Sequence, residues 1–310
     1  MMENNWKEDK DGITIEVPAE FDFRPNLHYL QRDKNEIMFE IENETIIRLL
    51  SVNDERIFIK ISAPDNHKLL IQFLDGARPK SVRTKCDVVK YIRDWFDLDT
   101  DLVPFYEMAQ TDPLLKHLIQ QFYGLRIVGM PNLFEALCWG VLGQQINLGF
   151  AYTLKRQFVE KFGEAAEYNE KTYWVFPSFE KIAKLTVEDM SEIKMTVKKR
   201  EYIIGIAQLM ASGELSKERL LELAEFKKIE KELTKIRGIG PWTANYVLMR
   251  CLRYPTAFPI ADVGLHNAIK LLENMDRKPT KEEILKIAVP WKNWEAYAAF
   301  YLWRVSYSNK

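Results

Sequence analysis

The order of apolar and polar residues differs between the two ends of the chain. Near the N-terminus, short apolar runs rich in β-branched residues occur at 45–50, 56–61 and 68–74. Turn-forming residues, among them asparagine, aspartate and proline, separate these runs at 52–55 and 63–66. Short β-rich runs separated by turns are typical of an antiparallel sheet, which we therefore expect in the first third of the protein.

Helical periodicity replaces this pattern from residue 85 onward. Apolar residues there recur at three- and four-residue spacing, as they do on one face of a helix. The sequence predicts an α+β fold, with an N-terminal antiparallel sheet domain and flanking helices at 1–112, followed by mainly α-helical domains at 113–310. The expected helices lie at 85–96, 102–110, 113–122, 134–142, 151–162, 179–185, 187–193, 199–211, 220–236, 242–252, 263–272, 281–288 and 294–307.

Composition narrows the possible partners without naming one. The 310 residues are 47% apolar, enough for a packed core, and carry a formal net charge of −1. Nucleic-acid-binding domains are usually basic, so this charge counts mildly against such a partner, although a local patch and backbone amides can bind phosphates. The N-terminus lacks an apolar signal-peptide core and no run of about 18 apolar residues occurs, so we expect a cytoplasmic protein without a membrane anchor.

A glycine-rich stretch, IRGIGPWTANY, lies between two predicted helices. Gly238 and Gly240 permit unusual backbone conformations, and Pro241 suits the first turn of the following helix. One interpretation is an ordinary tight turn, since glycine and proline end helices in many proteins. The other is an anion site, because the first amides of a helix have no internal partners and can bind a phosphate. This stretch alone does not decide between them.

A second polar feature interrupts an apolar helix. The apolar stripe of the helix at 134–142 would continue at Gln145, but Gln144 and Gln145 place amide side chains there instead. The simplest interpretation is a solvated end of the helix. The alternative is that both glutamines reach toward a partner rich in hydrogen-bond donors and acceptors.

One carboxylate and several aromatic residues offer chemistry. Asp262 stands where a helix begins, and as an N-cap it needs no further role. The positive end of the helix dipole also favours its ionised form, which suits a group that faces a developing positive charge. Trp242, Tyr246 and Trp303 belong either to an aromatic core or to a pocket that binds a flat or cationic ring through stacking and cation–π contacts.

Together these motifs resemble the helix-hairpin-helix DNA glycosylase superfamily, most closely its bacterial 3-methyladenine DNA glycosylase II branch. The hairpin, at about 228–252, is carried by LTKIRGIGPWTANY, and Asp262 lies at the position of the family's catalytic aspartate. FEALCWGVLGQQINLGFA resembles the helix and glutamine patch ahead of the hairpin. PWKNWEAYAAFYLWR resembles the C-terminal tryptophan-rich helix, and FDFRPNLHYL the opening of the N-terminal sheet domain. The resemblance covers nearly the whole chain.

The resemblance implies that DNA lies against the hairpin. Gln145, beside Gln144, would enter the duplex where a base has left. A monovalent cation, Na⁺ or K⁺, would be held by the main-chain carbonyls of Thr234, Ile236 and Ile239. The amides that would contact a phosphate are those around Gly238, Gly240, Trp242 and Thr243.

No catalytic cofactor is implied by the resemblance. The iron–sulfur branch of the family has four clustered cysteines, whereas this chain has three cysteines far apart in sequence, so no cluster is expected. In family members that also cut the DNA strand, a hairpin lysine forms a Schiff base. Trp242 occupies that position here, so we expect a monofunctional enzyme without lyase activity.

The implied reaction is hydrolytic release of alkylated purines, such as 3-methyladenine and 7-methylguanine, from double-stranded DNA during base excision repair. Asp262 would be the catalytic residue, and the flipped base would stack among Trp242, Tyr246 and Trp303. The protein would act as a monomer on the DNA of the nucleoid. Two alternatives stay open: a glycosylase for oxidised or deaminated bases, and a non-catalytic DNA-binding protein that uses the hairpin as a phosphate clamp.

Overall fold

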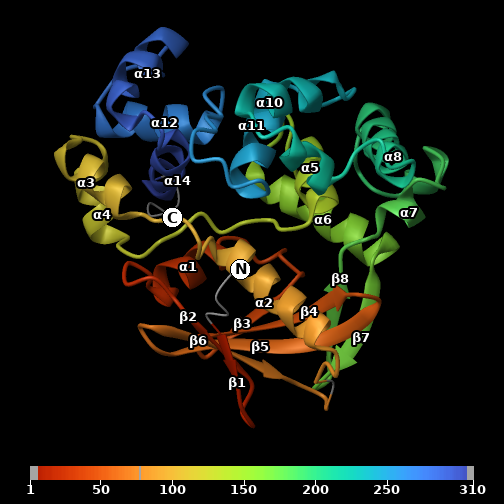
Figure 1. Ribbon diagram of the computed structural model, residues 1–310. Coiled ribbons are helices and arrows are strands. Elements are labelled where there is room, and N and C mark those ends of the chain that lie inside the picture. Colours follow the sequence, from red (N-terminus) through yellow and green to blue (C-terminus); the bar gives the residue numbers. More distant parts are fainter. Residues whose placement is uncertain (1–5, 77, 306–310) are drawn as a thin grey trace.

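The computed structural model of the protein describes residues 6–76 and 78–305 and shows a sheet domain packed against a larger group of helices (Figure 1). The main sheet has six strands, each antiparallel to its neighbours. In spatial order these are β1 (Trp6–Glu8), β2 (Ile13–Glu16), β6 (Lys68–Phe73), β5 (Glu55–Asp65), β4 (Thr45–Val52) and β3 (Glu40–Glu42). The predicted α+β fold with an N-terminal antiparallel sheet is confirmed.

Apolar side chains are buried on both faces of this sheet, which explains the near-continuous apolar runs of β4 and β5. Ile57, Ile59 and Ile61 alternate along β5 and enter the main core. Phe58 points to the opposite face, where it packs against Tyr173 at a ring-centroid distance of 5.5 Å. Because side chains alternate between the two faces of a strand, a strand that is covered on both faces loses its apolar–polar alternation.

Two helices join the sheet to the larger helical part. The first, α1 (Phe23–Leu30), lies in the stretch FDFRPNLHYL. Its N-cap is Asp22, whose side chain accepts a hydrogen bond from the Arg24 amide at 2.9 Å. The second, α2 (Val82–Phe96), buries one face against the core and runs between the sheet and the other helices (Figure 1). The buried face of α2 recurs at helical spacing and consists of Thr84, Val88, Val89, Ile92, Trp95 and Phe96.

The larger helical part has two groups of helices (Figure 1). α3 and α4 pack with the C-terminal helices, and α5 packs with α6, α8 and α11. No helix among residues 6–76 and 78–305 has both the length and the apolar character needed to cross a membrane. The helices are α3 (Val103–Thr111), α4 (Leu115–Gln121), α5 (Leu133–Leu142), α6 (Leu148–Phe162), α7 (Phe179–Ile182), α8 (Val197–Ala211), α9 (Lys217–Glu222), α10 (Phe226–Lys235), α11 (Pro241–Arg250), α12 (Val263–Leu272), α13 (Lys281–Ile287) and α14 (Glu295–Val305), with 3₁₀ turns at Glu188–Met190 and Val289–Trp291.

Some predicted helices have different limits in the structure. The expected helix at 220–236 is divided into α9 and α10, because Ala224 adopts a left-handed conformation with φ of 55° and turns the chain. The expected helix at 187–193 is only a three-residue 3₁₀ turn. The last predicted helix, 294–307, is α14, and its final two residues lie outside the described part of the chain.

Several strands were not predicted. β1, β2 and β3 have only three or four residues each, too few to show a periodic pattern. β7 (Glu164–Tyr168) and β8 (Lys171–Val175) form a separate hairpin that lies beside the main sheet (Figure 1). This hairpin buries few side chains, but the β-rich run Tyr173-Trp174-Val175 in β8 was a usable signal.

The predicted domain border between residues 112 and 113 stays a prediction. The helix just before it, α3, contacts the C-terminal helix α14. The ring of Phe105 lies 5.2 Å from that of Tyr301, and the hydroxyls of Tyr106 and Tyr301 are 3.0 Å apart. Contacts between the two predicted domains are therefore aromatic as well as polar.

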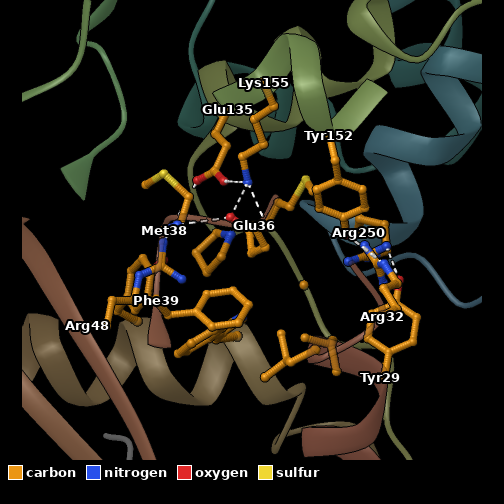
Figure 2. Close-up of a pocket in the computed structure, with 17 residues that line it drawn as sticks. Tyr29, Arg32, Glu36, Met38, Phe39, Arg48, Glu135, Tyr152, Lys155 and Arg250 are labelled. Carbon is orange, nitrogen blue, oxygen red and sulfur yellow. Dashed lines mark hydrogen bonds and ion pairs between the residues drawn. The ribbon is translucent and has the colours of Figure 1, made fainter. Parts of the chain in front are cut away.

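A buried cluster of charged side chains lies where the sheet domain meets the helices (Figure 2). The ammonium group of Lys155 on α6 lies 3.0 Å from a carboxylate oxygen of Glu36 and 3.1 Å from one of Glu135 on α5. Arg48 of β4 approaches Glu135 at 3.9 Å and stacks on the ring of Trp95. All four charged side chains are at most 9% exposed. Buried charges of this kind need one another, because none of them is solvated by bulk water.

We expect the stability of the protein to fall in acid partly because of this cluster. Burial alone would raise the pKa of Glu36, but Lys155 and the Met38 amide lower it below its usual value of 4.5. A lowered folded-state pKa adds stability that is fully present above the usual pKa and is lost as the pH falls through the lowered value. The free energy of unfolding, measured with urea from neutral pH down to about pH 3, should therefore fall less steeply with pH in Glu36→Gln than in the wild type. An identical pH dependence of the free energy of unfolding in the two proteins would contradict this account of Glu36.

Candidate active site

The glycine-rich stretch forms a tight hairpin between α10 and α11. α10 ends at Lys235, and α11 begins at Pro241 with Gly240 as its N-cap. Within the turn, the Ile239 amide donates to the Ile236 carbonyl at 2.9 Å. Gly240 and Pro241 are exposed, so the start of α11 is accessible from outside. The hairpin thus combines a tight turn with an exposed helix start, and the two interpretations drawn from the sequence do not exclude each other.

Gly238 and Gly240 have different structural requirements, which a pair of alanine variants should separate. Gly238 has φ of 94°, and a Cβ atom added to it would lie 2.3 Å from the ring of Tyr202. Gly238→Ala should therefore lower the free energy of unfolding by roughly 1–3 kcal/mol and weaken DNA binding with it. Gly240 has φ of −90° and no heavy atom within 4 Å of an added Cβ, so Gly240→Ala should keep the wild-type stability.

The measurement for this pair is urea unfolding together with binding to a duplex oligonucleotide. If DNA contacts the hairpin at Gly240, the affinity of Gly240→Ala should fall while its unfolding curve stays that of the wild type. If Gly238→Ala changed the free energy of unfolding as little as Gly240→Ala does, the role given to the left-handed backbone at Gly238 would be contradicted.

Gln144, in the turn that follows α5, supports the hairpin. Its Nε2 atom donates to the Gly238 carbonyl at 2.8 Å and lies 3.3 Å from the Thr243 hydroxyl, which is buried. The Lys199 ammonium donates in turn to the carbonyls of Leu142 and Gln144, at 2.8 and 2.9 Å, and burial lowers the pKa of Lys199. The side chain of Gln144 therefore holds the hairpin in place, and its predicted contact with DNA stays a prediction.

Gln145 has a different environment from its neighbour. It adopts a left-handed conformation with φ of 57°, it is exposed, and it lines the same cleft as Asp262. No hydrogen bond fixes its side chain within the described part of the chain. These features fit a residue that enters DNA, a role for Gln145 that stays a prediction.

Asp262 is both an N-cap and the centre of a hydrogen-bonded group. Its Oδ1 accepts a hydrogen bond from the Leu265 amide at 3.0 Å, as the N-cap of α12. The same oxygen accepts from the Trp303 indole at 2.9 Å, and Oδ2 accepts from the Trp242 indole at 2.9 Å. Three N–H groups therefore fix the orientation of the carboxylate at the edge of a cleft. Capping alone does not require the two indoles.

The predicted aromatic residues are brought together around this carboxylate. The ring of Trp242 lies 5.5 Å from that of Tyr246, which lies 6.2 Å from that of Trp303 at an interplanar angle of 28°. Tyr246 and Trp303 are largely buried, and Trp242 is half-buried. All three line the cleft, so they form one wall of a site as well as part of the core.

The cleft has a volume of about 720 Å³, within the usual range for small-molecule sites. It lies beside the hairpin and contains no lysine among the described residues that line it. Its walls come from α1, α5, α6, α11, α14 and the start of α12. The lining residues are Tyr29, Arg32, Trp139, Gly143, Gln144, Gln145, Ile146, Asn147, Leu148, Ala151, Trp242, Tyr246, Arg250, Ala261, Asp262, Val263, Gly264 and Trp303.

Among the lining residues that were not predicted are four with large polar or aromatic side chains: Tyr29, Arg32, Trp139 and Arg250. Arg250 follows Tyr246 by four residues on α11, and this helical spacing was a usable signal. Tyr29 and Arg32 lie more than 200 residues before the hairpin, and only the packing of the sheet domain brings them to the cleft.

The carbonyl groups predicted to hold a cation have the right chemistry. Thr234 and Ile236 lie in or just after the last turn of α10, where carbonyls have no helical partner. Within the described part of the chain, no hydrogen bond reaches the carbonyl oxygens of Thr234 and Ile239, and that of Ile236 accepts one from the Ile239 amide. These residues therefore fit Na⁺ or K⁺, which are cations that bind oxygen ligands. Separately, the described residues contain no group of three or more histidine, cysteine, aspartate or glutamate side chains that could hold a metal ion.

Comparison with known sequences decides the family. Residues 138–293 match the family described as "HhH-GPD superfamily base excision DNA repair protein", and residues 3–137 match "8-oxoguanine DNA glycosylase, N-terminal domain". The chain belongs to the HhH-GPD superfamily. The DNA-3-methyladenine glycosylase of Bacillus subtilis is 62% identical over 302 residues, which cover 97% of this chain and 99% of that protein. DNA-3-methyladenine glycosylase 2 of Escherichia coli is 27% identical over 180 residues, 58% of this chain and 60% of that protein.

Solved structures show the same superfamily fold. The 3-methyladenine DNA-glycosylase of Archaeoglobus fulgidus has a TM-score of 0.78 at 22% identity, covering 94% of this chain and 97% of that one. The 8-oxoguanine glycosylase/lyase of Clostridium acetobutylicum, in complex with double-stranded DNA, has a TM-score of 0.74 at 19% identity, covering 100% and 99%. At these identities the similarity concerns the fold.

Membership of the HhH-GPD superfamily confirms the resemblance drawn from the hairpin, Asp262 and the tryptophan-rich helix. The full-length match to a glycosylase supports the predicted enzyme class, a DNA N-glycosylase. The roles of individual residues rest on the geometry above, and they are argued next.

Proposed function

We propose that this protein is a DNA glycosylase that removes alkylated purines from duplex DNA by hydrolysis. The observation that carries the proposal is the Asp262 carboxylate, fixed by two indole N–H groups at the edge of a cleft of about 720 Å³ beside the hairpin. The 62% identity to a protein named DNA-3-methyladenine glycosylase supports the choice of alkylated purines.

The hairpin binds the DNA backbone. The exposed start of α11 offers amides with no internal partner to a phosphate, and the absence of a side chain at Gly240 leaves room for its approach. A Na⁺ or K⁺ ion at the carbonyls of Thr234, Ile236 and Ile239 would add positive charge at that point. Such binding does not need a basic protein, which agrees with a formal net charge of −1.

The target base leaves the duplex to reach the cleft. Flipping costs a few kcal/mol and costs least for a damaged or mispaired base, which already contributes selectivity. Gln145, exposed at the rim, enters the gap that the base leaves. The base then stacks against the aromatic wall formed by Trp242, Tyr246 and Trp303.

Asp262 acts on the sugar rather than on the base. Cleavage of the glycosidic bond develops positive charge on the deoxyribose, and a carboxylate already oriented toward it lowers the barrier. Asp262 also orients or deprotonates the attacking water. A cationic alkylated purine is a good leaving group, so the general acid that glycosidases usually need is dispensable. The products are the free base and an abasic site.

Strand cleavage is not part of this reaction. Schiff-base chemistry needs a nucleophilic amine, and no lysine is found among the described residues that line the cleft. The position of the lyase lysine in the family is occupied by Trp242, whose indole is hydrogen-bonded to Asp262. The protein thus works as a monofunctional enzyme and, we infer, as a monomer on damaged double-stranded DNA of the nucleoid, in the cytoplasm.

A panel of duplexes, each incubated with the wild type in the presence of a chelator, tests the proposal. The panel consists of dimethyl sulfate-treated DNA and of oligonucleotides that carry 8-oxoguanine, hypoxanthine or uracil. Release of methylated purines from the first, with no chelator sensitivity, is expected. Release of 8-oxoguanine alone would replace the proposal by the oxidised-base alternative. Binding without release of any base would leave only the non-catalytic clamp.

A further inference from the structure

The floor of the cleft carries two positively charged side chains that the proposed reaction does not use. Arg250, on α11, is 2% exposed, and its Nη1 donates to the hydroxyls of Tyr29 and Tyr246 at 2.6 and 2.9 Å. Arg32 donates through Nε to the Tyr152 hydroxyl at 2.6 Å. Its guanidinium carbon lies 3.9 Å from the centre of the Tyr29 ring. Figure 2 shows Tyr29, Arg32, Tyr152 and Arg250 gathered together on one side of the junction.

Neither guanidinium has an acidic partner. Among the described residues, no carboxylate forms an ion pair with Arg32 or Arg250, because Glu36 and Glu135 are taken by Lys155 and Arg48. The Nε atom of Arg250 is buried and has no hydrogen-bond partner. An arginine as buried as Arg250 usually has an acidic partner, since desolvation of its charge is costly. The arrangement is therefore suited to an acceptor supplied from outside.

The position of Arg250 relative to Asp262 tells which part of a ligand it would meet. A continuous series of contacts leads from the carboxylate to Trp303, from Trp303 to Tyr246, and from Tyr246 to Arg250. All four residues line the cleft. With the sugar at Asp262, the base points along this wall, and the edge farthest from the glycosidic bond faces Arg250.

We infer that Arg250, assisted by Arg32, selects purines that carry an oxygen at carbon 6. The inference rests on the proposed function and names its preferred substrates. The polar groups at this floor are two guanidinium groups, which can only donate, and phenol hydroxyls that already accept a hydrogen bond from them. The 6-oxygen of 7-methylguanine and of hypoxanthine is an acceptor and satisfies this floor. The 6-amino group of 3-methyladenine is a donor and cannot pair with either guanidinium.

Charge strengthens the same preference. Two cations at the floor disfavour a positively charged base that brings no oxygen to neutralise them. Hypoxanthine is neutral and brings an oxygen, so it should be accepted although it is not alkylated. 3-Methyladenine should be released through the chemistry at Asp262 without help from Arg250.

Internal competition on one DNA sample tests this inference. Dimethyl sulfate-treated duplex contains both 7-methylguanine and 3-methyladenine, and the ratio of their initial release rates does not depend on the amount of active enzyme. The variant Arg250→Lys keeps the charge but loses the forked donor, and Arg32→Met removes the second guanidinium. The ratio of 7-methylguanine to 3-methyladenine should fall by about tenfold in Arg250→Lys, as expected for loss of one specific hydrogen-bonded contact, and less in Arg32→Met.

Arg253→Lys is the matched control. Arg253 follows the same helix, donates to the Ile127 carbonyl at 2.7 Å and does not line the cleft, so the ratio should stay at the wild-type value. Hypoxanthine release from a defined duplex should fall in Arg250→Lys in parallel with 7-methylguanine. A wild-type ratio in both Arg250→Lys and Arg32→Met overturns this inference but leaves the proposed function intact. Failure of the wild type to release either methylated base overturns both.

Discussion

Replacing Asp262 with asparagine is expected to lower the single-turnover rate of base release by about 10³-fold while DNA binding is retained. Asparagine keeps the size of the side chain and still accepts from the Leu265 amide, so α12 keeps its cap. It lacks the negative charge that the sugar needs as the bond breaks. Rates with enzyme in excess, and affinity for an undamaged duplex, separate the two effects.

The same substitution should cost a measurable amount of stability. One oxygen of Asp262 accepts from Trp242 and the other from Trp303, so an amide nitrogen placed opposite either indole leaves two donors facing each other. A loss of about 1–3 kcal/mol is expected. Asp22→Asn is the matched control, because Asp22 also caps a helix but lies outside the cleft, and it should keep the wild-type rate. A wild-type rate in Asp262→Asn would reduce Asp262 to a cap.

Replacing Lys155 with methionine is expected to destabilise the fold by roughly 3–5 kcal/mol, because it leaves buried carboxylates without their partner. Lys155 is the only ammonium group within 4 Å of Glu36 and Glu135 among the described residues, and all three side chains are at most 9% exposed. Burial lowers the pKa of Lys155, but the two carboxylates raise it overall above its usual value, so the lysine stays charged at neutral pH.

A second lysine on the same helix provides the comparison. Lys161 pairs with Glu192 at 2.6 Å, but these side chains are 29% and 80% exposed, and exposed pairs contribute at most about 1 kcal/mol. Lys161→Met should therefore unfold in urea almost as the wild type does. If Lys155→Met and Lys161→Met lowered the free energy of unfolding equally, the buried cluster would contribute no more to stability than a surface ion pair.

The parts of the site that lie close in sequence were predictable. The hairpin glycines, the N-cap position of Asp262 and the helical spacing of Trp242 and Tyr246 are local features, and local features determine local structure. The predicted base-pocket residues do surround the carboxylate, with indole hydrogen bonds that no sequence pattern indicated.

The parts that depend on long-range packing were not predictable. Tyr29 and Arg32 reach the cleft only because the sheet domain packs against α6 and α11. The β7–β8 hairpin covers an apolar face of the sheet, a contact between segments more than 100 residues apart that no local pattern marks. The helix predicted at 220–236 contains a turn at Ala224, which carries no glycine or proline to mark it.

The arginines also change the interpretation of the aromatic pocket. An aromatic wall attracts a cationic ring, but Arg250 already lies 5.4 Å from the centre of the Tyr246 ring and 5.3 Å from that of Tyr29. The other two rings of the proposed wall, Trp242 and Trp303, have no lysine or arginine over them among the described residues. Discrimination by hydrogen bonding at the floor then adds to attraction by the aromatic faces.

The central claim is that this protein hydrolyses the glycosidic bond of alkylated purines and leaves the strand intact. Chromatography of the bases that the wild type releases from dimethyl sulfate-treated duplex, combined with strand analysis before and after alkali, tests it most directly. Free methylated purines, with strands that break only after alkali, are the predicted result. No released base, or strands already broken by the protein before alkali, would contradict the account.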